Sequence, residues 1–210
     1  MFSKFTEISP VVWGILAALV LIGIVLYCIV SDKRKLSVRM MANASLCIAL
    51  SFILSYIRLY KMPQGGSITL ASMLPLFMFA FAYGVGPGML TGAAYGLLQF
   101  IQDAYFVHPI ELLLDYPLAF AMLGLCGLAP HISKRFGMIG GILLGVFGRF
   151  VCAFLSGVIF FGMYAPEGQH VFVYSAIYNG LYLIPETAIC MALAMIPQLQ
   201  RIARTLSLNS

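Results

Sequence analysis

The sequence has very few charged residues. Asp, Glu, Lys and Arg together make up 9% of its 210 residues, whereas hydrophobic residues make up 62% and the mean hydropathy is +1.00. A soluble domain usually carries about 25% charged residues, so this chain has too little polar surface to stay in solution. The composition excludes a soluble protein and predicts an integral membrane protein.

Catalytic and energy-converting motifs are also missing. The sequence contains no GxxxxGK[ST] phosphate loop, no GxSxG or HExxH motif and no paired catalytic carboxylates. An intramembrane enzyme acting on a lipid would need a metal-binding Asp cluster or a nucleophile with a base, and the sequence shows neither. We therefore expect no enzyme activity, and any energy that the protein needs for its function has to come from elsewhere.

Frameworks for metals and disulfides are absent as well. The three histidines are dispersed and form no metal-ligand pattern, so we expect no metal and no cofactor. The cysteines lie in apolar runs without CxxC spacing, which predicts small buried side chains rather than disulfides. They are Cys28, Cys47, Cys126, Cys152 and Cys190.

Long apolar runs divide the chain into predicted membrane spans. The runs are too continuous for barrel strands, and an open sheet cannot cross lipid, so the predicted fold is an all-α helical bundle. The seven predicted spans are 11–30, 40–60, 68–83, 84–105, 108–128, 139–164 and 171–197. No cleavage pattern follows the first span, so we expect it to remain as an anchor. The expected organisation is an N-terminal anchor with a basic loop (1–36), a six-span domain (37–200) and a polar tail (201–210).

The basic residues predict how the chain is oriented. The net charge of +5 arises in short loops between spans, which indicates topology rather than nucleic-acid binding. The larger set, taken as cytoplasmic, is Lys33, Arg34, Lys35, Arg39, Lys134, Arg135, Arg201 and Arg204, and the smaller, external set is Lys4, Arg58 and Lys61. This bias places the C-terminus in the cytoplasm and the N-terminus outside the plasma membrane.

Two acids interrupt the predicted span at 108–128. Glu111 and Asp115 lie one helical turn apart and would share a face. A carboxylate at the centre of a span costs about 2.5–3.5 kcal/mol on insertion scales, so it rarely faces lipid. Asp115 is therefore the first candidate for a ligand contact. His108, with Pro109 behind it, is expected to cap the helix.

Six residues on three spans share one depth in the predicted outer leaflet. An acid, phenols, an amide and aromatic faces suit a small, partly cationic heterocycle, because they offer charge pairing, hydrogen bonds and stacking. The alternative for the aromatic residues is the interfacial aromatic belt. The six are Asp115, Tyr116, Gly157, Phe161, Tyr174 and Asn179.

Two further charges lie at equal depth on the last two spans. Arg149 and Glu186 are each about three turns from the cytoplasmic end, on consecutive antiparallel helices. This placement predicts a buried structural ion pair. The functional alternative is a role in conformational change or proton movement.

Small residues recur at helical spacing on two spans. Gly84, Gly88, Gly92 and Gly96 line one side of a helix, which predicts a close packing seam against an internal helix or a partner subunit. Cys47 and Ser51 form a weaker pair of small residues on the second span.

Five segments carry a resemblance to a known family. In order, they are GGSITLASMLPLF, YGVGPGMLTGAAYGLLQFI, HPIELLLDYPLAFAMLGLCGL, RFVCAFLSGVIFFGMYAPEG and VYSAIYNGLYLIPE. Together they resemble the thiamine-specific S-components (ThiT) of energy-coupling factor (ECF) transporters over residues 40–197. The resemblance covers the six-span block and leaves out the first span.

The resemblance implies a membrane subunit that captures thiamine with high affinity. Such subunits dock on a module of one transmembrane coupling protein and two ATPases, so ATP is used by the partners alone. The family's ligand contacts fall on the same six residues named above, and its docking motif falls roughly on Cys47 and Ser51. Ala153 stands where the family commonly has His, and Gly66 stands near a position where some members have Trp. These two departures leave a thiamine precursor, an analogue or another vitamin as alternative ligands.

Overall fold

The structure, a computed structural model, describes residues 37–103, 105, 107–129 and 137–208. The anchor predicted at 11–30, Cys28 and the basic loop after the anchor lie outside the described residues. The helices are α2 (Val38–Ser55), α3 (Leu74–Tyr83), α4 (Val85–Gln102), α5 (Pro109–Leu113), α6 (Ala119–Ala121), α8 (Gly137–Phe160), α9 (Val171–Ala194) and α10 (Pro197–Leu208). A π-helical segment (η2, Leu114–Leu118), two 3₁₀ segments (η3, Met122–Leu128; η4, Gly162–Tyr164) and two strands (β1, Arg58–Lys61; β2, Ser67–Thr69) complete the described chain.

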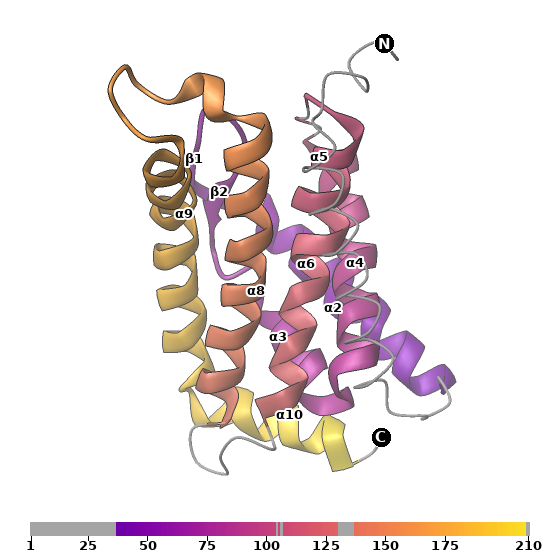
Figure 1. The fold of residues 1–210 in the computed structure, drawn as a ribbon. Helices are drawn as coiled ribbons and strands as arrows, with labels where there is room; N and C mark the ends of the chain where they lie inside the picture. The colour runs from indigo at the N-terminus through magenta and orange to yellow at the C-terminus, as the bar shows by residue number, and fades with distance from the viewer. Residues whose placement is uncertain (1–36, 104, 106, 130–136, 209–210) are drawn as a thin grey trace.

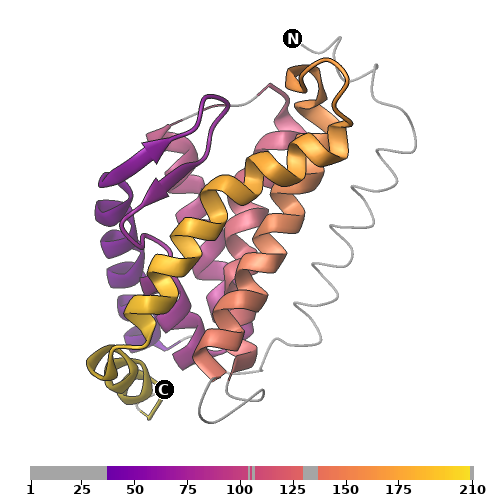
Figure 2. The ribbon, with the colours of Figure 1, turned by 90° about the vertical axis from the view of Figure 1, so that its left-hand side faces the viewer.

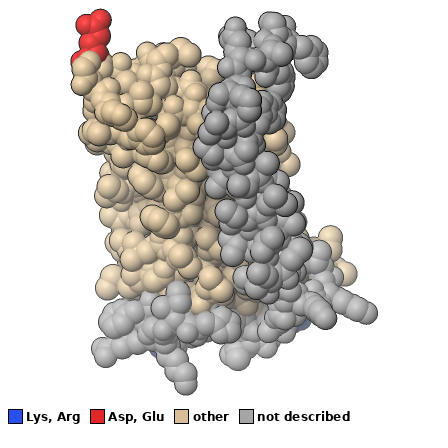
Figure 3. Space-filling view, in the orientation of Figure 1, with Lys and Arg blue, Asp and Glu red and all other residues tan. Residues whose placement is uncertain are grey.

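The helices form a bundle, as predicted. Within the described residues, four helical stretches are long and apolar enough to cross a membrane: α2, Pro109–Leu128, α8 and α9. They run side by side with α4, while the strands and α5 lie at one end and α10 lies across the other (Figure 1 and Figure 2). In the face shown in Figure 3, the described surface between these ends is uncharged, as a lipid-facing surface should be.

The second and third predicted spans are wrong at their boundary. Helix α2 ends at Ser55, not at residue 60, and the chain then forms an antiparallel hairpin of β1 and β2. Gly65 and Gly66 both have positive φ and allow the tight turn between the strands. The apolar run 68–83 therefore contains a strand and the short helix α3, which periodicity in a continuous apolar run cannot separate.

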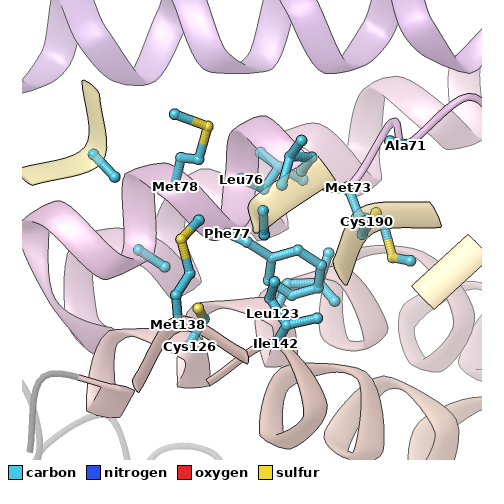
Figure 4. Packing of buried hydrophobic residues seen from close by; sticks show 14 of the residues in the cluster. Ala71, Met73, Leu76, Phe77, Met78, Leu123, Cys126, Met138, Ile142 and Cys190 are labelled. Atoms are coloured by element: carbon cyan, nitrogen blue, oxygen red, sulfur yellow. The ribbon is translucent and has the colours of Figure 1, made fainter. Parts of the chain in front are cut away.

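Helix α3 is the centre of the hydrophobic core. Nine of its ten residues are buried, as expected of a helix that is apolar on all sides. Phe77 is completely buried, and in Figure 4 it lies close to Leu123 of η3 and Ile142 of α8. Met73 and Cys190 pack in the same cluster, and the four described cysteines are free thiols.

The glycine seam of α4 packs against a helical stretch of the same chain. Of the two alternatives from the sequence, an internal helix and a partner subunit, the structure shows the first. A Cβ at Gly92 would overlap the carbonyl oxygen of Phe120, and a Cβ at Gly96 would overlap that of Tyr116. The glycines therefore let α4 approach the backbone of the 109–128 stretch closely. This contact holds one wall of the site described below.

The polar tail expected after residue 200 is part of helix α10. This helix is amphipathic, and its buried Ala203 faces the core cluster built around α3. The sequence prediction missed it because the helix has only 12 residues and begins at Pro197, directly after the last span.

A Gly92→Ala substitution should lower the melting temperature of the detergent-solubilised protein by several degrees. Overpacking of a tight contact typically costs about 1–3 kcal/mol. Gly180→Ala on α9 is the matched control, because a Cβ there would lie 3.6 Å from Ile184, an ordinary contact. Equal melting temperatures for the two variants would contradict the conclusion that the contact at Gly92 requires a glycine.

Candidate functional site

A cavity of about 220 Å³ lies at the hairpin end of the bundle. Its wall comes from the hairpin, the end of α4, the 109–128 stretch, α8 and α9. The structure brings all six predicted site residues to this one wall: Asp115, Tyr116, Gly157, Phe161, Tyr174 and Asn179.

Asp115 lies in the π-helical segment Leu114–Leu118. Pro117 in this segment has no N–H to donate, which favours a widened turn, and such turns often occur at functional sites. The hydroxyl of Ser156 on α8 donates to Asp115 Oδ2 at 2.7 Å. Asp115 Oδ1 is buried and has no hydrogen-bond partner among the described residues. The cavity wall thus contains a carboxylate oxygen with unused bonding capacity.

Tyr116 joins the wall to the chain after α4. Its hydroxyl lies 3.0 Å from the carbonyl oxygen of Asp103 and 3.1 Å from that of Tyr105, and the Tyr105 N–H donates to it at 3.2 Å. The ring of Phe100 packs against Tyr116 edge-on, with centroids 5.4 Å apart. Tyr116 is therefore held rigidly, with its ring at the cavity.

Gly157 and Asn179 brace α8 against α9. A Cβ at Gly157 would overlap the hydroxyl of Ser175, so the glycine is required for the contact between the two helices. Asn179 Nδ2 donates to the carbonyl oxygens of Ala153 (3.2 Å) and Ser175 (3.0 Å), and its Oδ1 accepts from Tyr182 at 2.9 Å. Both residues still border the cavity.

Aromatic rings cover the outer part of the cavity. Phe161 stacks with Tyr105 at a centroid distance of 6.1 Å, and Tyr105 is a site residue that the sequence did not identify. The hydroxyl of Tyr174 makes no hydrogen bond with any described residue and is available to a ligand. Tyr174, Tyr178 and Tyr182 all line the cavity, and their spacing of four residues was the signal that could have identified the last two.

Arg149 and Glu186 do not form the direct ion pair that the sequence predicted. Arg149 lies with its guanidinium carbon 4.0 Å from the centroid of the Phe120 ring and donates to Met73 Sδ at 2.8 Å. Glu186 instead accepts hydrogen bonds from the hydroxyls of Thr69 and Ser72. The chain before α3 turns these hydroxyls inward, and both bind Glu186 Oε1. Arg149 is left to line the cavity.

Glu111 is buried at the cavity wall. It is 1% exposed, and its Oε2 accepts from the N–H groups of Val107 (2.7 Å) and His108 (3.3 Å). His108 Nδ1 accepts from the N–H of Ile110 at 3.1 Å. The two residues form a capping box, so the predicted cap at His108 is confirmed.

The hairpin covers part of the cavity at its end of the bundle. The hydroxyl of Tyr178 accepts from the N–H of Gln64 at 2.8 Å and donates to the carbonyl oxygen of Gly65 at 3.0 Å. At the other edge of the hairpin, Asp103 contacts both Arg58 and Lys61. Hydrogen bonds to the Asp103 carboxyl, first from Lys61 and to a smaller extent from Arg58, hold its pKa below the usual value. This second set of contacts is ionic and lies near solvent.

The predicted docking residues are not both at the surface. Ser51 is completely buried, and its carbonyl oxygen accepts from the Tyr95 hydroxyl at 3.4 Å. Cys47 packs partly against the cluster of Met40 and Tyr83. Ser51 therefore offers no surface to a partner, because helix α2 turns this face toward α4.

Comparisons with known proteins agree with this architecture. A family model described as thiamine transporter protein (Thia_YuaJ) matches residues 41–205. The thiamine transporter ThiT of Bacillus subtilis is 38% identical over 142 residues, which cover 62% of this chain and 73% of that protein. The thiamine transporter ThiT of Lacticaseibacillus paracasei is 33% identical over 123 residues, which cover 51% of this chain and 61% of that protein.

A solved structure shares the fold. ThiT from Listeria monocytogenes superposes with a TM-score of 0.64 and 24% sequence identity, covering 76% of this chain and 96% of that chain. The family match extends from α2 to α10 and includes every element of the cavity wall. On this evidence the chain belongs to the thiamine transporter protein family.

Proposed function

We propose that the chain is the substrate-capture subunit of a thiamine uptake system. It takes thiamine from outside the cell with high affinity and delivers it through an ATP-driven ECF module. Membership of the thiamine transporter family supports the ligand. The observation that carries the proposal is the buried Asp115 Oδ1 at the cavity wall, which has no hydrogen-bond partner among the described residues, because a buried carboxylate is costly until a cation neutralises it.

The charges deep in the cavity suit a monocation. Of the six charged side chains that line the cavity, Arg58, Lys61 and Asp103 interact with one another at the edge of the hairpin. The other three, Glu111, Asp115 and Arg149, lie on the bundle helices. When all three are ionised, their formal charges sum to −1. A ligand with a single positive charge, such as the thiazolium of thiamine, would make this region neutral. An uncompensated charge in a low-dielectric site is much more costly than a paired one.

The other wall residues would provide hydrogen bonds and stacking. The free hydroxyl of Tyr174 is placed to bond a ring nitrogen or amino group, and the Phe161–Tyr105 pair offers an aromatic face to a ring. Tyr116 would close the site from the side. Asn179 would contribute through its cavity-facing edge while it continues to brace α8 against α9.

The hairpin end would face the outside of the cell. Arg58 and Lys61 lie at this end, whereas Arg201 lies on α10 at the opposite end of the bundle (Figure 1). Two members of the larger basic set, Arg39 at the start of α2 and Arg201 on α10, lie at this opposite end, which the positive-inside rule assigns to the cytoplasm. The hairpin would then act as the lid of a plasma-membrane receptor whose C-terminus is cytoplasmic.

The exposed face of α2 is the proposed docking surface for the transmembrane coupling protein, which in turn binds two ATPases. Leu46, Leu50 and Ile53 are between 51% and 68% exposed on this face. Ser45 and Ala49, four residues apart, are also exposed. They form the small-residue pair that permits close helix approach, in place of the pair predicted at Cys47 and Ser51.

An Asp115→Asn variant should bind thiamine at least about tenfold more weakly, because the amide cannot neutralise the thiazolium. Isothermal calorimetry on the purified protein measures the change. Glu167→Gln removes an exposed carboxylate from the loop between η4 and α9 and should leave the affinity unchanged. Equal affinities for the wild type and Asp115→Asn would remove Asp115 from the site.

A panel of water-soluble vitamins should identify the ligand. A receptor is stabilised by the ligand it binds, by about 2.7 kcal/mol at a hundred times the dissociation constant. We expect thiamine to raise the melting temperature most, above its phosphates, its pyrimidine moiety and unrelated vitamins. A larger shift with another vitamin would redirect the proposal to that ligand.

An Ala49→Trp substitution should abolish co-purification with the coupling protein and ATPases while thiamine binding persists, since the bulky ring prevents close helix approach. Leu181→Trp on α9 is the matched control, because Leu181 is 57% exposed on a different face. Retention of the module by Ala49→Trp would show that docking uses another surface.

A further inference from the structure

We infer that Asp103 is a positioning residue: its ionic contacts with β1 hold the hairpin over the cavity and set how long a bound ligand stays there. The inference rests on the proposed function. It concerns a residue at the end of α4 that lies outside the six predicted ligand contacts.

One carboxylate oxygen of Asp103 engages two cations of the hairpin. Arg58 Nη1 lies 2.6 Å and Lys61 Nζ lies 2.7 Å from Asp103 Oδ2. Both cations belong to β1, and Lys61 pairs with Ser67 of β2 across the sheet. A single side chain at the end of α4 therefore restrains both strands.

A second link holds the other side of the hairpin. Tyr178 on α9 binds the turn through Gln64 and Gly65, so the hairpin spans the cavity between α9 and the end of α4. The α9 link consists of neutral hydrogen bonds, whereas the Asp103 link consists of charges whose side chains are 25% (Arg58), 40% (Asp103) and 54% (Lys61) exposed.

The ionic link is the one that opens more readily. Ion pairs between partly exposed side chains are weak and are screened by salt. They can therefore bias a lid toward its closed position without locking it. The hairpin would open at β1 while Tyr178 keeps the turn attached to α9.

The cavity wall is connected directly to this link. The hydroxyl of Tyr116 lies 3.0 Å from the carbonyl oxygen of Asp103, and the Tyr116 ring lines the cavity. A ligand packed against Tyr116 steadies the backbone that presents the Asp103 carboxylate. Occupancy of the cavity and closure of the hairpin thus favour each other.

The test is the dissociation rate of radiolabelled thiamine from the purified protein, measured by chase with unlabelled thiamine. At about 20 mM NaCl, where screening is weak, Asp103→Asn should release thiamine about fivefold faster than the wild type. Raising the salt to about 500 mM should accelerate the wild type toward the variant and leave the variant nearly unchanged. Asp103→Glu should keep the wild-type rate within about twofold, and Glu167→Gln should match the wild type at both salt concentrations.

Charge reversal provides an independent test. Asp103→Arg should release thiamine faster still, because it places three cations together, and combining it with Arg58→Glu and Lys61→Glu should restore slow release. If Asp103→Asn does not fold, Arg58→Gln with Lys61→Gln removes the same link. Equal release rates in wild type and Asp103→Asn, or an equal salt response, would overturn the inference. Failure of the wild type to bind thiamine at all would instead refute the proposed function.

Discussion

The close approach of α4 to the 109–128 stretch is the constraint on which the rest of the structure depends. Glycines replace side chains at the contact, so backbone lies against backbone, and this places the irregular segment with Asp115 and Tyr116 at a fixed position opposite α8 and α9. A helix held in this way can contain a π-helical turn and Pro117 without losing its place, because its neighbours fix its position. The seam therefore permits the local irregularity that turns a carboxylate toward a cavity.

Much of the site followed from the sequence because membrane topology orders residues by depth. Asp115, Tyr174 and Asn179 were assigned to one layer, and the structure places them on one cavity wall. The cost of a charge in lipid supplied the argument for Asp115. Depth in the membrane does not show toward which neighbour a side chain points around its helix, however. For that reason the sequence predicted a pair of Arg149 and Glu186, although the two residues have different partners in the structure.

The features that the sequence missed depend on tertiary contacts. The hairpin follows α2 within an apolar region, and its strands are short, at four and three residues, so no alternating pattern was long enough to reveal it. Ser51 was assigned to the wrong face because small residues occur on both sides of α2. Small-residue spacing identifies a contact but not the partner, whereas burial in the folded chain distinguishes the two faces.

Only Tyr56 and Ile57 separate the end of α2 from the first residue of β1. The helix with the exposed apolar outer face and the strand beside the cavity are thus consecutive elements of the chain. A tilt of α2 away from the bundle would draw Arg58 with it, since the three residue steps from Ser55 to Arg58 span at most about 11 Å. Movement of α2 and displacement of the strand beside the cavity are in this way joined by the covalent backbone itself, with no need for a separate signal.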